Sequence, residues 1–299
     1  MLVARVYQLG CDRKMERGFK AVLARRLEAS VLKLINRSFD VVGDIAIIKI
    51  PKAVEQHERL VAEAIMQTNT HIKTVLRQTS AVASDYRLRA IKWIGGEKKT
   101  ETIHRENGCI FGVDLKECYF SPRLIHERMR IAGQVRPGEV IVNMFAGVGC
   151  YSIVIARHSR AERVYSVDIN PAAVRSMQEN INTNKAAGQV VPVEGDAKII
   201  IERSLQNVAD RVLMPLPQRA YEYLDSALQA LKPSGGWIHY YEFEHALKGE
   251  SPVEKAKVKV VKRLRNSCLH IDGFFGGIVR SVGPNWYQVA LDIHLANLL

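Results

Sequence analysis

Two glycines and one acid in the chain have the spacing of a nucleoside-binding βαβ unit. A β-branched apolar run begins at Val140 and leads into a turn that contains Gly147 and Gly149, and a helical pattern follows. About twenty residues further on, a second strand pattern ends in Asp168. Glycines let the backbone approach a ligand closely, and an acid at this position accepts hydrogen bonds from ribose hydroxyls. We therefore expect a nucleoside site at the carboxyl ends of these strands.

The residues after the turn indicate which nucleoside is bound. A dinucleotide fold has a third glycine that packs the helix against a pyrophosphate, whereas this chain reads Gly149-Cys-Tyr-Ser152 there. A mononucleoside such as S-adenosylmethionine is thus favoured over NAD. A glycine turn that binds no ligand is the remaining alternative.

Polar and stiff residues follow the next two predicted strands. Asp196 comes after strand 190–194, where it could accept from the exocyclic amine of an adenine while the backbone of Ala197 donates. An acid at this place is also expected simply as a helix cap. Strand 211–214 is followed by Pro215-Leu-Pro217, which would form a wall beside a flat base. An ordinary strand end is the alternative interpretation.

The helix predicted directly before the cofactor-binding strand carries Glu127. Ser121 is a good N-cap, with Pro122 at the first helical position. Arg123 and Glu127 lie four residues apart on one face, with Arg130 three further on. One interpretation is that these residues only form an exposed ion pair on the helix surface. The position of the helix beside the predicted cofactor strand favours a functional role for them.

The net charge of the chain indicates a polyanionic partner. It amounts to +12 over 299 residues, and a field of this kind attracts nucleic acid. The basic residues cluster in three stretches, 13–26, 123–136 and 255–265. Such clustering favours a nucleic-acid partner over charge that serves solubility alone.

Composition excludes several other classes. No apolar run approaches the roughly 18 residues of a membrane span, and the N-terminus lacks the apolar core of a signal peptide. The five cysteines form no CxxC pair, so neither a zinc site nor a disulfide framework is indicated, and no ligand cluster suggests another metal. We expect a cytoplasmic protein, monomeric and without membrane contact.

Hydrophobic patterns predict two domains, 1–118 and 119–299. The expected elements of the first are a helix over 14–34, a hairpin over 39–50, a helix over 53–66, and strands over 86–94, 100–105 and 109–113. Their irregular order indicates an α+β unit. From Ser121 on the pattern becomes regular. The expected elements are a helix, strand 140–144, a helix, strand 163–168, helix 171–184, strands 190–194 and 211–214, helix 218–231 and strand 236–243. This alternation requires a parallel sheet with crossover helices. The last predicted pair, 258–265 and 286–295, would add antiparallel edge strands.

Four motifs taken together resemble one enzyme family. They are Tyr119-Phe-Ser-Pro-Arg-Leu-x-x-Glu-Arg128, Asn143-Met-Phe-Ala-Gly-Val-Gly149, Val167-Asp-Ile-Asn-Pro171 and Arg211-Val-Leu-Met-Pro-Leu-Pro217. From about residue 38 onward the chain resembles the archaeal and eukaryotic type of tRNA (guanine-N1)-methyltransferase acting at position 37. It is also similar to the sister enzyme of wybutosine synthesis, the tRNA aminocarboxypropyltransferase. The resemblance implies an α/β fold with a class I (Rossmann-like) methyltransferase domain after a smaller α+β domain, S-adenosylmethionine as cofactor, and a tRNA anticodon loop as partner.

The same resemblance assigns roles to individual residues. Arg87, in Tyr86-Arg-Leu-Arg89, matches the arginine that contacts the target base, Glu127 matches the proposed general base, and Pro215 lies beside the base. Which of Arg87 and Arg89 faces the base stays open. The cofactor-binding residues that it implies are Tyr119, Arg128, Phe145, Gly147, Gly149, Asp168, Ile169, Asp196 and Ala197.

The chain departs from the family pattern in three places. Asn143 stands where the family usually has an acid, and Pro215 replaces the asparagine of the family's Asn-Leu-Pro. The second change looks like an archaeal subgroup whose members also methylate a tricyclic wyosine intermediate. The stretch before Arg87 is too short for the family's separate tRNA-elbow domain. We expect methylation of N1 of guanosine 37, and whether the wyosine intermediate is also a substrate stays open. Aminocarboxypropyl transfer and a non-enzymatic basic RNA-binding module stay open as alternatives.

Overall fold

The computed structural model describes residues 18–80, 86–265 and 269–297. The chain forms two compact units, and each is described by itself. The first takes in the chain up to His104 together with Gly112–Pro122, and the second takes in Arg105–Phe111 and everything from Arg123 onward. Among the residues within these ranges, no helix is long and apolar enough to cross a membrane.

The first unit contains a four-stranded mixed sheet. Its strands, in spatial order, are β1 (Asp40–Val42), β2 (Ile45–Lys49), β3 (Thr74–Gln78) and β4 (Ile91–Gly96). The β1–β2 pair is antiparallel, as expected of the hairpin at Gly43-Asp44, β2–β3 is parallel, and β3–β4 is antiparallel. The 3₁₀ helix η1 (Lys52–His57) and helix α4 (Glu58–Thr68) connect β2 to β3.

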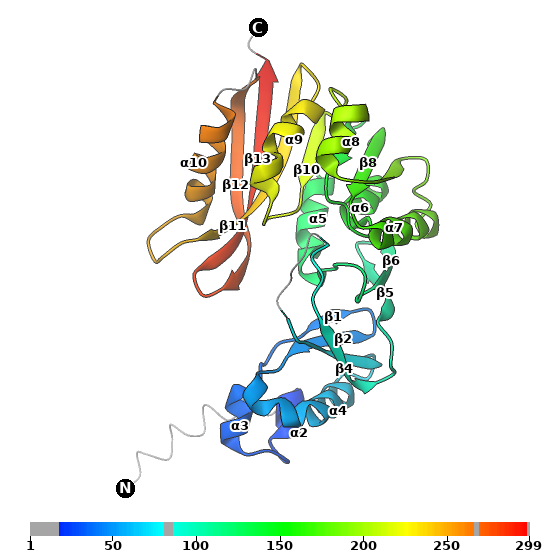
Figure 1. The fold of residues 1–299 in the computed structure, drawn as a ribbon, viewed down its shortest axis with the longest axis vertical. Helices are drawn as coiled ribbons and strands as arrows, with labels where there is room; N and C mark the ends of the chain where they lie inside the picture. Colours follow the sequence, from blue (N-terminus) through cyan, green and yellow to red (C-terminus); the bar gives the residue numbers. More distant parts are fainter. Residues whose placement is uncertain (1–17, 81–85, 266–268, 298–299) are drawn as a thin grey trace. The chain divides into compact units, whose positions relative to one another are not determined.

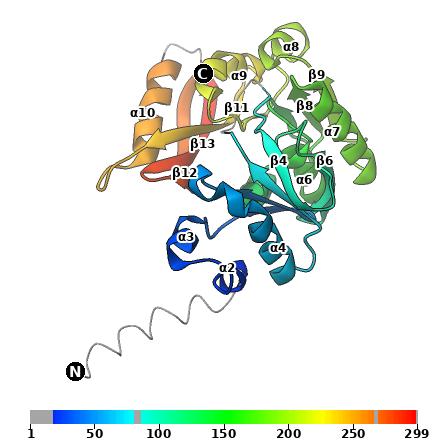
Figure 2. The ribbon, with the colours of Figure 1, turned by 60° about the horizontal axis from the view of Figure 1, so that its bottom comes forward.

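Three helices cover one face of this sheet (Figures 1 and 2). They are α2 (Phe19–Leu23), α3 (Ala29–Leu34) and α4. Apolar residues of α4 at helical spacing, such as Val61 and Ile65, pack with Ile48 of β2 and Val75 of β3. The expected α+β character of this unit is therefore confirmed.

Two predicted elements of the first unit are wrong. Within the described part of the predicted helix 14–34, the chain turns between α2 and α3, which lets Leu23 and Leu32 bury in the same core. The predicted strand 86–94 begins only at Ile91, because Tyr86 and Arg87 form a turn in which Arg87 has a φ of 56°. Strand β3 was not expected.

A hairpin follows the four-stranded sheet in the sequence. Strands β5 (Glu101–Glu106) and β6 (Cys109–Asp114) flank Asn107-Gly108, as predicted. Asn107 and Gly108 have φ values of 48° and 69°. Positive φ at both central residues is the geometry of a type I′ turn, for which Asn-Gly is the preferred sequence.

The second unit contains a seven-stranded sheet (Figure 1). Its strands are β7 (Val140–Asn143), β8 (Arg163–Asp168), β9 (Val190–Glu194), β10 (Arg211–Met214), β11 (Gly235–His245), β12 (Leu269–Gly283) and β13 (Trp286–Asn297). They lie in the order β12-β13-β11-β10-β7-β8-β9. The five from β11 to β9 are parallel, and β13 is antiparallel to both of its neighbours. The strand order reverses beside β7, and a ligand is expected in the crevice at such a reversal.

Helices pack on both faces of this sheet. Val142 of β7 belongs to a core shared with α8 (Ala197–Ser204), α9 (Leu224–Ala230) and α10 (Pro252–Leu264). The next residue, Asn143, donates to Ser152 of α6 (Cys150–His158). Because successive side chains of a strand point to opposite faces, α6 lies on the other face. Two more helices are α5 (Ile125–Ala132), preceded by η2 (Pro122–Leu124), and α7 (Pro171–Thr183).

The main error in the second unit lies at its C-terminal end. Of residues 258–265, which were predicted as a strand, all but the C-cap Arg265 belong to helix α10, and the edge strand is β12. The Ser251 side chain accepts from the Glu254 N–H at 3.2 Å, and Pro252 occupies the first turn. These helix-start signals outweigh the β-branched residues that follow. Helix α8 was also missed, and the predicted helix 218–231 begins as a 3₁₀ turn, η3 (Ala220–Tyr223).

Candidate active site

The glycine turn after β7 has a backbone that other residues rarely adopt. Gly147 and Gly149 have φ values of 57° and 90°. A Cβ atom on Gly149 would lie 2.9 Å from the side chain of Met177 and 3.1 Å from that of Ile153. The turn therefore needs glycine at position 149 both for its conformation and for packing between α6 and α7.

Asp168 ties the end of β8 to this turn. Its Oδ2 accepts a hydrogen bond from the Gly147 N–H at 2.6 Å, and its Oδ1 accepts from the Asn170 N–H at 2.9 Å. Asp168 is half-buried, whereas the following Ile169 is 41% exposed. A fixed carboxylate thus lies at the carboxyl edge of the sheet beside an exposed apolar side chain.

Asp196 performs the capping role that the sequence left open. Its Oδ1 accepts from the Lys198 N–H at 2.8 Å at the start of α8, where Ala197 is buried. Its Oδ2 accepts from the hydroxyl of Tyr223 at 2.9 Å. Burial, together with this bond to Asp196, raises the pKa of Tyr223 to about 12. The ring of Phe145 packs edge-on against Tyr223, with centroids 5.0 Å apart.

Tyr223 therefore links two of the predicted cofactor residues, Phe145 and Asp196. Sequence reasoning missed Tyr223, because a tyrosine in a 3₁₀ turn after β10 carries no motif. Its contacts with side chains at the ends of β7 and β9 give it a place at the same edge of the sheet.

Pro215 follows β10 directly and is half-buried. The carbonyl of Met214 accepts from the Leu216 N–H at 2.8 Å, and the Leu216 carbonyl accepts from Ala220 at 2.9 Å. The turn is thus closed by its own backbone. At the start of the turn, position 215 presents a ring in place of a side-chain amide.

In the first unit, the structure brings Arg87 and Tyr119 together. The Arg87 guanidinium lies over the Tyr119 ring, 4.1 Å from its centroid. Arg89 instead faces Asp40, at 3.7 Å, and Gln78, at 3.4 Å. Both arginines are thus held within their unit, and Arg87 is the one held beside another predicted site residue.

Arg128 forms a buried ion pair. Its Nη1 donates to Glu106 at 2.5 Å, and its guanidinium lies 5.9 Å from the ring centroid of Tyr151. Removing one partner from such a pair leaves an uncompensated buried charge, which costs about 3–5 kcal/mol. The position of Arg128 in the family motif is thus explained by structure, and its cofactor contact stays a prediction.

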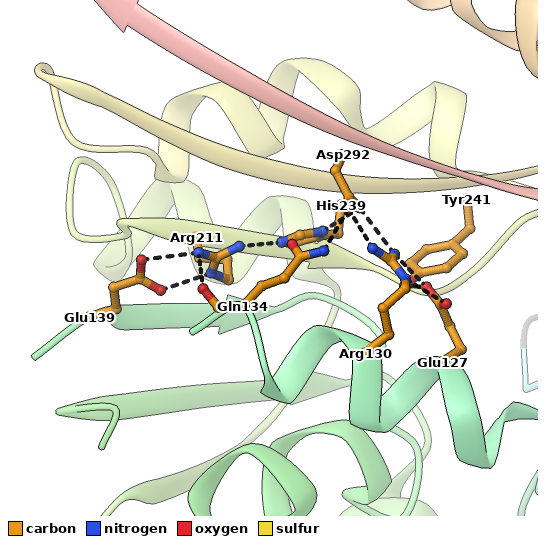
Figure 3. Close-up of polar contacts among 8 residues, drawn as sticks. All are labelled: Glu127, Arg130, Gln134, Glu139, Arg211, His239, Tyr241 and Asp292. Carbon is orange, nitrogen blue, oxygen red and sulfur yellow. Dashed lines mark hydrogen bonds and ion pairs between the residues drawn. The ribbon is translucent and has the colours of Figure 1, made fainter. Parts of the chain in front are cut away.

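Glu127 on α5 is buried, with 7% of its surface exposed, and it is held by donors on two elements (Figure 3). Its Oε1 accepts from the Tyr241 hydroxyl at 2.6 Å and from Arg130 Nη2 at 2.7 Å. Its Oε2 accepts from Arg130 Nε at 2.8 Å. Glu127 also lines a cavity of about 200 Å³ together with Arg130, Phe275, Gly276, Gly277, Ile278, Val279, Ala290 and Asp292.

Arg130 continues the network to β13. It donates to Asp292 through Nη1 at 2.5 Å and through Nη2 at 3.1 Å. Burial alone would raise the pKa of Asp292, but hydrogen bonds from His239 and Arg130 outweigh burial and hold that pKa well below its usual range. Tyr241, His239 and Asp292 could not be found from the sequence, because no local pattern connects them to α5.

The second unit fits S-adenosylmethionine. Glycines with positive φ, the Asp168 carboxylate and the Asp196 carboxylate occupy the ends of consecutive strands beside the reversal of strand order. Phe145, Ile169 and Tyr223 add apolar surface at the same edge. This set of residues suits a nucleoside with ribose hydroxyls and an adenine amine. It defines a class I methyltransferase domain.

The chain belongs to the TRM5/TYW2 family of S-adenosylmethionine-dependent transferases. Residues 102–268 match the TRM5/TYW2 methyltransferase domain, and residues 19–100 match the TYW2 N-terminal domain.

Three relatives illustrate the membership. The tRNA (guanine(37)-N(1))-methyltransferase Trm5b of Pyrococcus abyssi is 37% identical over 88% of this chain and 76% of its own, and its crystal structure superposes with a TM-score of 0.81 over 90% of this chain and 78% of its own. The tRNA 4-demethylwyosine(37)-methyltransferase Taw21 of Saccharolobus solfataricus is 39% identical over 86% of this chain and 93% of its own.

The third relative is a tRNA(Phe) (4-demethylwyosine(37)-C(7)) aminocarboxypropyltransferase of Methanocaldococcus jannaschii. It is 35% identical over 72% of this chain and 82% of its own. A crystal structure of TYW2 from that organism, in complex with AdoMet, superposes with a TM-score of 0.65 at 25% identity over 87% of this chain and the whole of its own.

Proposed function

We propose that this chain transfers the methyl group of S-adenosylmethionine to N1 of guanosine 37 in tRNA, acting as a cytoplasmic monomer. The observation that carries the proposal is the buried Glu127 carboxylate on α5, the helix that precedes strand β7 and its glycine turn. It is held by Arg130 of the same helix and by Tyr241 of β11. A positioned carboxylate is the group that this reaction needs. The similarity to a tRNA (guanine(37)-N(1))-methyltransferase over most of both chains supports it.

Guanine N1 carries a proton and is a poor nucleophile at neutral pH. Its methylation needs a base that accepts this proton and a cation that stabilises charge developing on O6. We assign the first role to Glu127 and the second to Arg87. The cofactor supplies an activated methyl group, so positioning provides much of the remaining rate. Taking the base out of the anticodon-loop stack costs a few kcal/mol, which contacts between the base and the protein offset.

A second substrate, the tricyclic wyosine intermediate, is favoured by Pro215. A ring at this position gives a flat wall with no side-chain amide to select guanine. The Saccharolobus relative, named for methylation of 4-demethylwyosine, is matched over 93% of its length. We therefore propose activity on the intermediate in addition to guanosine.

The test is to weigh the nucleosides of a tRNA transcript after incubation with the protein and S-adenosylmethionine. Guanosine 37 should gain the mass of one CH₂. A parallel reaction with tRNA that carries 4-demethylwyosine should show the same gain on that nucleoside. A gain equal to an aminocarboxypropyl group in either reaction would contradict methyl transfer. An unmodified transcript that is nevertheless bound would favour the RNA-binding alternative.

A further inference from the structure

Glu127 and Asp292 share one guanidinium. Arg130 donates to Glu127 through Nε and Nη2, and it donates to Asp292 through Nη1 and Nη2 (Figure 3). The side chain of Glu127 is 7% exposed and that of Asp292 is 6% exposed. Two buried carboxylates are thus matched by a single positive charge.

The neighbour of Asp292 on β11 adds no charge. His239 is fully buried, and its Nδ1 lies 2.7 Å from Asp292 Oδ1 while its Nε2 lies 2.6 Å from Arg211 Nη1. A guanidinium can only donate, so Nε2 must accept and the ring proton must be on Nδ1. Burial lowers the pKa of His239, and the nearby Arg211 and Arg130 lower it further. Asp292 has the opposite effect but is outweighed. The imidazole is therefore neutral.

Arg211 does not balance the excess carboxylate either. It is paired with Glu139, through Nε at 2.8 Å and Nη2 at 3.0 Å. Arg128 of α5 pairs with Glu106 of β5, so these two charges also cancel. Tyr241 and Tyr151, which face Glu127 from β11 and α6, stay neutral because burial raises both of their pKa values. Within the described residues, the charges that contact Glu127 directly or through Arg130 thus sum to one negative charge in excess.

Asp292 has more hydrogen-bond donors than Glu127. Asp292 accepts from His239, from Arg130 and from Gln134 Nε2 at 2.9 Å, and these bonds stabilise its ionised form. Glu127 has only Arg130 and Tyr241 as the donors described above, and it shares Arg130 with Asp292. Asp292 therefore resists protonation and remains an ionised partner of Arg130, which it shares with Glu127.

We propose that Asp292 is a positioning residue for the transfer reaction: it fixes Arg130 against Glu127 and, by claiming part of its charge, keeps Glu127 a strong proton acceptor. This inference rests on the proposed role of Glu127 as general base. It assigns a function to a residue of the last strand, 162 positions from Arg130 along the chain.

The pH dependence of single-turnover methylation tests this inference, because the two ends of the ion pair act on Glu127 with opposite signs. Asp292→Asn leaves the whole Arg130 charge to Glu127, so the acidic limb of the rate profile should move to lower pH and the plateau rate should fall. Arg130→Gln removes the cation, so the acidic limb should move to higher pH. Each shift should be about one pH unit, the lower end of what a neighbouring charge causes.

The matched control is Asp272→Asn. Asp272 is an exposed acid of β12 that pairs with His294 of β13 at 2.5 Å, so its loss removes one negative charge from the same hairpin without touching Arg130. Its acidic limb should match that of the unaltered protein. Asp292→Glu should restore most of the Asp292→Asn change. S-adenosylmethionine binding by calorimetry should be unchanged in all four proteins, which separates an effect on the base from a loss of fold.

Limbs that shift in the same direction in Asp292→Asn and Arg130→Gln, or do not shift, would overturn the inference. If Asp292→Asn does not fold, Arg130→Gln alone decides, and an unmoved or lowered limb contradicts the inference. Failure of the proposed base would look different, since Glu127→Gln would then methylate at a normal rate. Loss of activity in Glu127→Gln with unmoved limbs in the other variants would refute only the role of Asp292.

Discussion

The side chain of Asp168 accepts a hydrogen bond from the backbone N–H of Gly147 at 2.6 Å. The last residue of β8 thereby fixes the turn that follows β7, although the two are 21 positions apart. In a class I methyltransferase domain the same acid is expected to bind the ribose of the cofactor. One carboxylate can thus both hold the glycine turn in shape and contact the ligand.

Replacing Asp168 with alanine should weaken S-adenosylmethionine binding about tenfold or more, because a hydrogen bond to a charged group is worth about 1.5–3 kcal/mol. Isothermal titration calorimetry measures this directly. Asp225→Ala is a suitable control, since Asp225 lies on α9 of the same unit in an exposed pair with Arg263. Unchanged affinity in Asp168→Ala would remove Asp168 from the cofactor site.

Glu127→Gln should lower the single-turnover methylation rate roughly 10²-fold or more, the scale of general base catalysis. The amide keeps the shape of the side chain but cannot accept the N1 proton. Cofactor binding should survive, because none of the contacts described for Glu127 involves the glycine turn. Glu254→Gln, on the exposed face of α10, provides the matched control.

A near-normal rate in Glu127→Gln would mean that Glu127 only holds Arg130 and Tyr241 in place. The unfolding temperature distinguishes that outcome from a catalytic one. If Glu127 is purely structural, its replacement lowers the unfolding temperature and leaves the rate near normal. If Glu127 is the base, its replacement lowers the rate in a protein that unfolds normally.

The cofactor half of the site could be predicted because its signals are local. Strands 163–168, 190–194 and 211–214 have the predicted bounds. An apolar run indicates each strand, and Asp168, Gly195 or Pro215, at or directly after its last residue, marks its end. Gly147, Gly149 and Asp168 lie at one edge because the carboxyl ends of parallel strands meet there.

The network around Glu127 could not be predicted. Tyr241 is 114 positions from Glu127 along the chain, and Asp292 is 162 from Arg130. Their place was hidden by the error over residues 258–265, because the wrong strand leaves the register of β13 undefined. With β11 and β13 paired, His239 lies opposite Asp292, and the ion-pair chain follows.

Protein stability should decline as the pH falls below about 6.5, the ordinary pKa of histidine. His239 has a lowered pKa in the folded state, so the unfolded chain takes up a proton first and is favoured as the pH drops. Asp292 acts in the same direction at lower pH. Its folded pKa lies below the usual 3.8, so its contribution is present above that value and is lost as the pH falls further.

Thermal unfolding followed by circular dichroism between about pH 8 and pH 2 measures this trend. His239→Gln should flatten the first part of the decline, because glutamine does not titrate. Since this residue contacts both Asp292 and Arg211, the variant should also be less stable at neutral pH. If the unfolding temperature of this variant falls with pH as steeply as that of the unaltered protein between about pH 6.5 and 5, groups other than His239 cause the decline.

Binding of tRNA should depend steeply on salt, but the basic cluster at 255–265 is less available than its sequence suggests. On α10, Lys255 pairs with Glu250, Arg263 pairs with Asp225, and Lys259 contacts both Glu242 and Glu244. Exposed pairs of this kind contribute little to stability, but they reduce the charge that a phosphate meets.

The affinity for tRNA should therefore fall by orders of magnitude between about 50 and 200 mM salt if six or more phosphates are neutralised across the protein.

Lys262 is exposed on α10 and lies outside the ion pairs just described. Lys262→Ala should reduce the slope of log affinity against log salt by about 1 if α10 contacts the tRNA, because one phosphate contact is lost. Lys259→Ala should change the slope less, since its charge is already matched by two carboxylates. Fluorescence anisotropy with a labelled anticodon stem-loop measures all three proteins. Equal slopes in the three proteins would place the tRNA contact away from α10. A flat salt response in the unaltered protein would show that its net charge of +12 does not serve tRNA binding.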